Sequence, residues 1–315
     1  MAPWPGGAPF ALFLSHDIDH VHDREMWRIL ADLNHIRRMI LKGEGKRARM
    51  ATARVGRAIL NPKPPLRAFD AILRAEAQFG FKSTFFLLHD HYWARHGARY
   101  RLGDRVVREV VDLIVSAGCE LGLHGGYYKI NDTDAYRASR DVIAREFGIA
   151  PVGVRNHYLR LDGERTWRAQ ADAGFNYDST FGHRDQLGPK EGRVRPFWVG
   201  APPGCDHRGL VELPLSLMDV ALFRCAGFDG EQALDAAWQA IGPVIAGGGL
   251  VTLLWHNTYF DEPEYWDWQW VYERLLERLA ALNPWCATGA EIDQWWRKWQ
   301  EGRAKASGQP GPPSA

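Results

Sequence analysis

The sequence predicts an α/β protein in which parallel strands alternate with covering helices. Short apolar runs bounded by glycine or proline recur along the chain, and amphipathic helical stretches separate them. Repeated units of this length favour parallel strands joined by helical crossovers. Aspartate, histidine and arginine follow the apolar runs directly, which is where barrel and open-sheet α/β enzymes build their active sites.

The first half of the chain carries three of the predicted strands. Residues 10–15 form a short apolar run, which is typical of a buried strand. A helical pattern follows over 66–79, and 83–88 is the second strand. A helix over 106–114 ends at Gly118, and residues 120–124 form the third strand.

The second half continues the same alternation. A helix is predicted over 134–147, with Gly148 as its stop signal. A last helical region lies within 293–298. The further predicted strands are 152–158, 175–177, 210–213 and 250–256.

Composition indicates a protein without a global affinity for nucleic acid. The 315 residues include 39 Lys and Arg against 38 Asp and Glu, so no strong net field is present. Prolines interrupt the N-terminal apolar stretch, and we expect neither a signal peptide nor a transmembrane segment. The four cysteines have no CxxC spacing, which is typical of reduced thiols and favours a cytoplasmic location.

Two segments stand apart from a single predicted domain over 8–300. Residues 36–67 carry ten Lys or Arg against one Glu and include a proline-rich end, which predicts a basic helical insertion on the surface. This insertion is either a solvated basic face or an anionic surface contact. The tail over 301–315, rich in Gly, Pro, Ser and Lys, is predicted to be disordered.

The strongest chemical signal follows the first strand, in the run His16-Asp17-Ile18-Asp19-His20. Strand alternation places Asp17 and Asp19 on one face. Two carboxylates this close need a cation or a shared proton, which indicates a metal site with one Asp as ligand and the other as base. The alternative is a pair of solvated loop aspartates that cap the next helix.

Other strand ends supply matching side chains. His124 ends one strand and is followed by two glycines, which allow a close approach. Arg155 and His157 share a strand face by alternation, so Arg155 can hold a carboxylate ionised and His157 can ligate a metal. His256 ends a late strand and could act as a general acid. Each of these residues, taken alone, could instead be structural.

Together these motifs resemble the polysaccharide deacetylase family, the NodB-homology or carbohydrate esterase family 4 group, over about residues 10–299. The runs that carry the resemblance, in chain order, are Ser15-His16-Asp17-Ile18-Asp19, Lys82–Phe86, Gly122-Leu123-His124, Arg155, Tyr177-Asp178-Ser179-Thr180 and Leu254-Trp255-His256. The resemblance implies a distorted (β/α)7-type barrel. It also implies Asp17 as base, Asp19 and His124 as metal ligands, Arg155 as the residue that orients the base, and His256 as acid.

The sequence departs from the family pattern at two positions. Tyr128 stands where the second motif usually supplies a further histidine, and His157 stands where the third motif usually has proline. We infer from strand facing that His157 replaces the missing ligand, and Tyr128 stays open as the alternative.

The implied activity is metal-dependent hydrolysis of N-acetyl groups on a saccharide or glycan precursor. Zinc fits the Asp and His ligands best, and manganese, cobalt and iron stay open. Tyr128 and Trp255 are candidate substrate-binding residues. The alternatives are a metal hydrolase for a non-sugar amide or O-acetyl ester, and an inactive metal- or sugar-binding barrel. A glycosidase is disfavoured, because carboxyls two residues apart do not flank a sugar ring.

Overall fold

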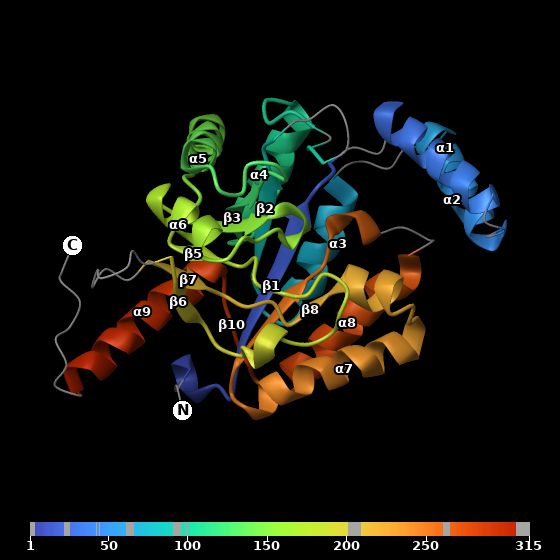
Figure 1. Ribbon diagram of the computed structural model, residues 1–315. Coiled ribbons are helices and arrows are strands. Elements are labelled where there is room, and N and C mark those ends of the chain that lie inside the picture. The colour runs from blue at the N-terminus through green and yellow to red at the C-terminus, as the bar shows by residue number, and fades with distance from the viewer. Residues whose placement is uncertain are drawn as a thin grey trace.

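The computed structural model describes residues 4–306 except 22–25, 42, 44, 61–65, 91–95, 99, 201–208 and 261–264. Its sheet contains β1 (Ala11–Ile18), β2 (Ser83–Leu88), β3 (Glu120–Gly125), β4 (Gly153–Asn156), β5 (Tyr177–Asp178), β6 (Phe197–Val199), β7 (Leu210–Glu212), β8 (Leu217–Met218), β9 (Leu250–Leu254) and β10 (Trp285–Cys286). Figure 1 shows this sheet with helices packed around it.

The strand order confirms the predicted parallel architecture. Neighbouring strands follow the order β6-β7-β5-β4-β3-β2-β1-β9-β8, and β10 pairs with β1. Only the β6–β7 pair is antiparallel among the described strands. The late strand β9 therefore lies beside the first strand, and the curled sheet has the form of the distorted barrel that the sequence predicts.

Helices of the body pack around the sheet. They are α3 (Leu66–Ala77), α4 (Arg105–Ser116), α5 (Thr133–Phe147), α6 (Glu164–Asp172), α7 (Gly230–Ala246), α8 (Trp266–Ala280) and α9 (Gly289–Ala306). All of them except α9 contribute to the large cluster on the outer face of the sheet. The predicted stop signals are confirmed, because Gly118 and Gly148 both adopt positive φ after their helices. The Asp132 carboxylate caps α5 by accepting from the Ala135 N–H at 2.9 Å.

Alternation along β1 divides its side chains between two buried layers. Leu12, Leu14 and Ile18 belong to the large cluster between the sheet and the helices. Ala11 and Phe13 belong to the inner cluster, to which Ile292 and Trp296 of α9 also contribute. The positions Ser15 and Asp17 continue the inner side, so both side chains face the interior of the curled sheet.

Helices α1 (Met26–Leu41) and α2 (Gly45–Leu60) form the basic insertion, and Figure 1 shows them side by side and apart from the sheet. The predicted boundaries of 36–67 therefore need correction at both ends. The insertion begins earlier, in α1, and residues 66 and 67 belong to body helix α3.

Four further boundaries differ from the sequence prediction in ways that matter for the site or the tail. Strand β1 runs on to Ile18, so Asp17 lies inside the strand. Strand β4 ends at Asn156 and β9 at Leu254, before the predicted ends at 158 and 256, so His157 and His256 lie just beyond their strands. Helix α9 continues to Ala306, so residues 301–306 are helical, and the rest of the predicted tail lies outside the described residues.

Candidate metal centre and active site

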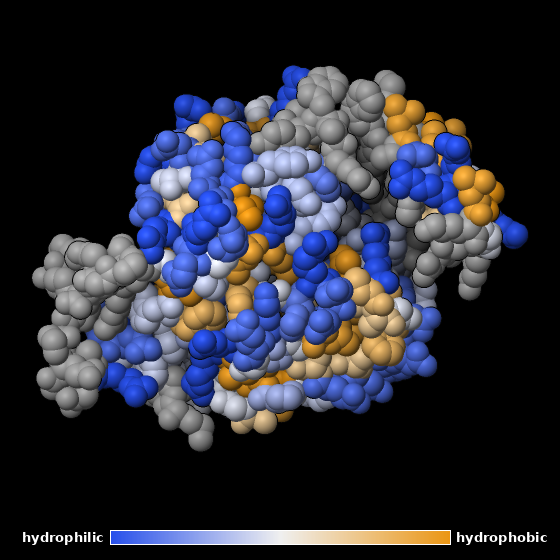
Figure 2. All heavy atoms as spheres, viewed as in Figure 1, coloured by the Kyte–Doolittle hydropathy of each residue, from blue (hydrophilic) through white to orange (hydrophobic). Residues whose placement is uncertain are grey.

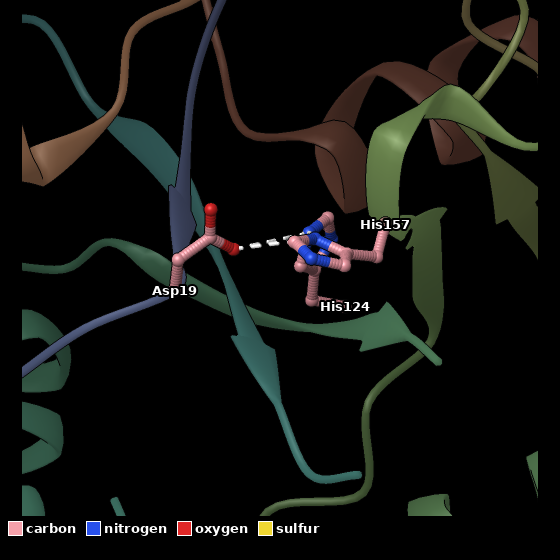
Figure 3. A group of neighbouring side chains, drawn as sticks. All are labelled: Asp19, His124 and His157. Atoms are coloured by element: carbon pink, nitrogen blue, oxygen red, sulfur yellow. Dashed lines mark hydrogen bonds and ion pairs between the residues drawn. The ribbon is translucent and has the colours of Figure 1, made fainter. Parts of the chain in front are cut away.

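Three predicted ligands converge at the carboxyl edge of the sheet. Asp19 follows β1, His124 lies in β3 and His157 follows β4, and one ligand atom of each lies within 4.8 Å of the others. Asp19 Oδ1 is 3.5 Å from His124 Nε2 and 3.4 Å from His157 Nδ1. The two imidazole nitrogens are 3.0 Å apart, and Figure 3 shows all three side chains pointing toward one another.

The contacts of this group fit a divalent cation. Asp19 Oδ1 is buried and has no hydrogen-bond partner among the described residues. An orphaned carboxylate oxygen in a buried site is costly unless a cation pairs with it. The Nδ1 of His124 lies 2.8 Å from the Arg155 carbonyl, and donation to that carbonyl leaves Nε2 available as a ligand.

The pKa shifts agree with a site for positive charge. Burial alone would raise the pKa of Asp19, but His157 and His124 outweigh it and hold that pKa well below its usual range. Burial lowers the pKa of His157 to about 4, against an opposing effect of Asp19. His157 is therefore neutral near pH 7, which is the form that binds metals. Burial also opposes charge on His124, but Asp17 and Asp19 raise its pKa.

A backbone turn, rather than strand alternation, places His157 in the centre. The strand ends at Asn156, and a 3-10 turn over His157–Leu159 follows. Tyr158 (φ 59) and Leu159 (φ 49) both adopt the left-handed conformation, which costs roughly 1–3 kcal/mol each for side chains of this size. This turn directs His157 to Asp19 while Tyr158 stays half exposed at the surface.

The alternative ligand Tyr128 is far more exposed than these three residues. Its side chain is 56% exposed, and its ring lies 4.9 Å from that of Tyr127. The residues that the structure brings together are therefore Asp19, His124 and His157.

The paired glycines after His124 allow the close approach that the sequence indicates. A Cβ atom on Gly125 would lie 2.2 Å from Asn156 Oδ1, and one on Gly126 would lie 1.6 Å from an oxygen of Asp90. Neighbouring side chains therefore fill the space that a larger residue would need.

Asp17 is held by Arg155 inside the curled sheet. Arg155 Nη1 donates to Asp17 Oδ1 at 3.2 Å and to Ser15 Oγ at 2.8 Å. The same guanidinium donates to the carbonyl and the hydroxyl of Ser179 and lies over the Phe86 ring at 4.5 Å. Both side chains are buried, so this ion pair fixes the position of the Asp17 carboxylate.

His256 carries a partner that the sequence analysis does not identify. Its Nδ1 lies 2.9 Å from Asp219 Oδ1, and its backbone N–H donates to Asp219 Oδ2 at 2.7 Å. Burial disfavours the charged imidazole, but Asp219 outweighs this effect and raises the pKa of His256 to about 9. The sequence offers one indication of this partner, because Asp219 directly follows the mostly apolar run 215–218. Only Leu217–Met218 of that run form a strand.

Trp255 requires a correction, because its side chain is fully buried. Its ring packs against Phe223 at 5.8 Å and Tyr272 at 5.2 Å in the layer between sheet and helices. The direct sugar contact predicted for Trp255 is therefore not available. Its carbonyl lies 2.7 Å from Nδ1 of His16, whose Nε2 is 2.8 Å from Glu76, so His16 of the first motif is structural.

A pocket of about 530 Å³ lies beside the centre. Tyr158, the neighbour of His157 in the chain, lines it, and the rings of these two residues are 4.5 Å apart. Arg184 lies over the Tyr158 ring at 5.4 Å. The full lining is Tyr128, Ile130, Asn131, Tyr158, Leu159, Arg160, Leu161, Asp162 and Arg184.

Comparisons with known proteins identify the fold. No family model matches the sequence, and no curated protein matches it. Among solved structures, a candidate polysaccharide deacetylase from Mycobacterium smegmatis is 20% identical with a TM-score of 0.61, covering 100% of this chain and 97% of that one. The peptidoglycan deacetylase PdaC from Bacillus subtilis is 11% identical with a TM-score of 0.48, covering 95% of this chain and 96% of that one.

A family pseudoenzyme also has a similar structure. The CE4 protein BA3943 from Bacillus anthracis is 11% identical with a TM-score of 0.44, covering 90% of this chain and 65% of that one.

Of the helices that the structure describes, none combines the length and apolar character of a membrane span. The similarity shows that this chain shares the fold of that candidate polysaccharide deacetylase from Mycobacterium smegmatis.

Proposed function

We propose that this protein is a metal-dependent deacetylase that hydrolyses N-acetyl groups of a saccharide or glycan precursor. The observation that carries the proposal is the convergence of Asp19, His124 and His157 beside the buried Asp17–Arg155 pair. The fold shared with a candidate polysaccharide deacetylase supports the same substrate class.

Asp19, His124 and His157 are the residues that would hold the cation. Zinc is the metal we propose, because one carboxylate and two imidazoles are ligands that zinc sites commonly use. When bound, the ion supplies a Lewis acid that polarises the acyl carbonyl and makes water a better nucleophile.

The acid and base roles follow from the contacts of two other side chains. Asp17 accepts the proton of the attacking water, and Arg155 holds the Asp17 carboxylate in place for that step. His256 is protonated near pH 7 because of Asp219, so it can donate a proton to the leaving amine. Asp219 acts as a positioning residue that holds the imidazole through Nδ1, which leaves Nε2 to donate.

The pocket that Tyr128 and Tyr158 line is the proposed saccharide subsite. Both tyrosines are half exposed, and aromatic rings of this kind suit the apolar faces of sugars. Arg184 offers further hydrogen-bond donors at the same wall.

We also propose a cytoplasmic location, supported by the thiol usage of the sequence, and an anionic surface contact through the basic helices.

Acetate release from defined substrates tests this function. The panel contains an oligomer of N-acetylglucosamine, an O-acetylated xylo-oligosaccharide and N-acetylethanolamine, each with the zinc-loaded protein. We expect acetate from the N-acetylated oligomer, and a loss of release in Asp19→Ala and His124→Ala. Asp293→Asn is the control, because Asp293 is a buried aspartate of α9 that is not a candidate ligand.

Two outcomes would replace this proposal. Acetate from the xylo-oligosaccharide alone would make the protein an esterase, and acetate from N-acetylethanolamine alone would make it a hydrolase of small amides. A stoichiometric metal with no acetate from any substrate would favour an inactive binding barrel.

A further inference from the structure

Helices α1 and α2 form a separate unit, here called the basic hairpin, that has its own small core. Ile36 of α1 packs with Ala48 and Val55 of α2, and Met39 and Ala51 lie against this cluster. The two helices pack against each other, and Figure 1 shows the pair projecting away from the sheet. The two helices of the hairpin therefore stabilise each other, and their outer surface is available to contact a partner.

The outer surface of the basic hairpin exposes large apolar side chains. Six of the eleven exposed large apolar side chains in the described structure belong to it. At about 100° per residue, the four on α1 fall within about 100° of its circumference, which makes one apolar face. Figure 2 shows these hydrophobic atoms on the projecting hairpin. They are Leu30 (48%), Leu33 (48%), Ile40 (62%), Leu41 (74%), Ile59 (49%) and Leu60 (85%).

The same segment concentrates the positive charge of the chain. Residues 26–60 contain nine Lys or Arg against two Asp or Glu, a net charge of +7, whereas the whole chain carries +1. The remaining residues therefore carry a net charge of −6. Arg37, Arg38 and Arg49 are exposed on the hairpin surface. A negatively charged surface therefore attracts the hairpin and repels the rest of the molecule.

We propose that the basic hairpin docks the protein on an anionic lipid bilayer, with its apolar side chains inserted at the headgroup boundary. Helices that combine basic residues with an exposed apolar face bind at this depth of a membrane. A nucleic acid would use the positive charge but would leave six apolar side chains in water. A second copy would place one hairpin of charge +7 against another, which disfavours self-association.

Sedimentation with lipid vesicles tests this docking surface in the full-length protein. The protein is mixed at low salt with vesicles of pure phosphatidylcholine, or with vesicles that contain roughly one third phosphatidylglycerol. We expect binding to the anionic vesicles only. Replacing Arg37, Arg38 and Arg49 together by Gln should weaken binding by about a hundredfold, since each arginine near such a surface contributes roughly fivefold. The matched control replaces three exposed arginines of the body: Arg101→Gln, Arg105→Gln and Arg165→Gln.

A second pair of variants tests the apolar part. Ile40→Ser with Leu41→Ser should weaken binding at least about tenfold, because two exposed side chains no longer leave water. The control is Val115→Ser with Leu282→Ser, which removes two exposed apolar side chains from the body and should leave vesicle binding unchanged. Circular dichroism of each variant establishes that the helices persist.

Three results would overturn the proposal. One is equal binding to neutral and anionic vesicles, and another is wild-type binding by the hairpin variants. The third is a short DNA or RNA duplex that binds more tightly than vesicles, and whose affinity depends on the arginines but not on Ile40 and Leu41. Acetate release from a soluble oligosaccharide is measured in parallel, so that a failure of docking is distinguishable from a failure of the proposed catalysis.

Discussion

Replacing Asp219 by Asn tests how the site keeps His256 charged. The Asp219 carboxylate meets both the Nδ1 and the backbone N–H of His256, and it is itself fully buried. The substitution retains the size of the side chain and removes its negative charge. The burial that opposes the imidazolium remains, as do the smaller opposing effects of Asp19 and Asp17, so the pKa of His256 should fall from about 9 toward the ordinary 6.5.

The size of the effect follows from these two pKa values. Their difference corresponds to about 3 kcal/mol of stabilisation of the imidazolium. A general acid must be protonated, so activity is present below its pKa and is lost as pH rises through it. At pH 8 the protonated fraction of His256 should fall from about nine-tenths to about three-hundredths, a roughly thirtyfold loss. At pH 6 the same cause should reduce the rate by less than about twofold.

The assay is kcat/KM for acetate release across pH 5.5–10 at full metal occupancy. Asp293→Asn is the matched control, because Asp293 is also a buried aspartate, on α9, with its pKa raised to about 6 by burial. We expect the basic limb to move to lower pH in Asp219→Asn and to stay in place in Asp293→Asn. A basic limb at the same pH in the wild type and Asp219→Asn would refute this role for the carboxylate.

The remaining predictions concern the base, the third ligand and a buried acid. Asp17→Asn should slow turnover by about a hundredfold or more while the metal stays bound, and near-wild-type turnover would remove Asp17 from the mechanism. His157→Ala should lose metal affinity in a competition titration and Tyr128→Phe should keep it; the reverse pattern would make Tyr128 the ligand. Burial and Asp178 raise the pKa of Glu212, so the folded chain holds a proton that the unfolded chain releases above about pH 4.5. The stability of the wild type is therefore lost as pH rises through the raised pKa. In urea titrations, the free energy of unfolding should fall less between pH 6 and pH 9 in Glu212→Gln than in the wild type. Equal losses in the two proteins would show that Glu212 does not hold this proton in the folded state.

Strand periodicity was sufficient to predict parallel strands whose ends carry the polar side chains, but it did not reveal β6, β8 or β10. Apolar runs that end in Asp, His or Arg identified where β1, β3 and β9 meet the edge, because carboxyl ends of parallel strands lie together. The placement of Asp17, Asp19 and His124 follows from this rule alone. The position of β9 beside β1 then brings His256 to the same edge.

Other features depend on contacts that no local pattern encodes. The turn at Tyr158 and Leu159 uses positive φ without glycine, and so has no sequence signature. Asp219 follows a strand of two residues, too short for periodicity to reveal, and its partner lies 37 positions away. The burial of Trp255 depends on the helices that cover β9, so an aromatic residue beside a catalytic candidate was mistaken for a sugar contact.

Metal content determined together with acetate release on the same samples distinguishes a metal-dependent deacetylase from the alternatives. The wild-type protein is stripped with a chelator, titrated with zinc and assayed on the N-acetylated oligomer at each step. The structure predicts one ion for each chain, bound through Asp19, His124 and His157, with acetate release rising in proportion to occupancy. Asp19→Ala and His124→Ala should bind no stoichiometric ion and release no acetate. Full acetate release by the stripped protein, or by Asp19→Ala, would show that catalysis does not require a metal held by Asp19.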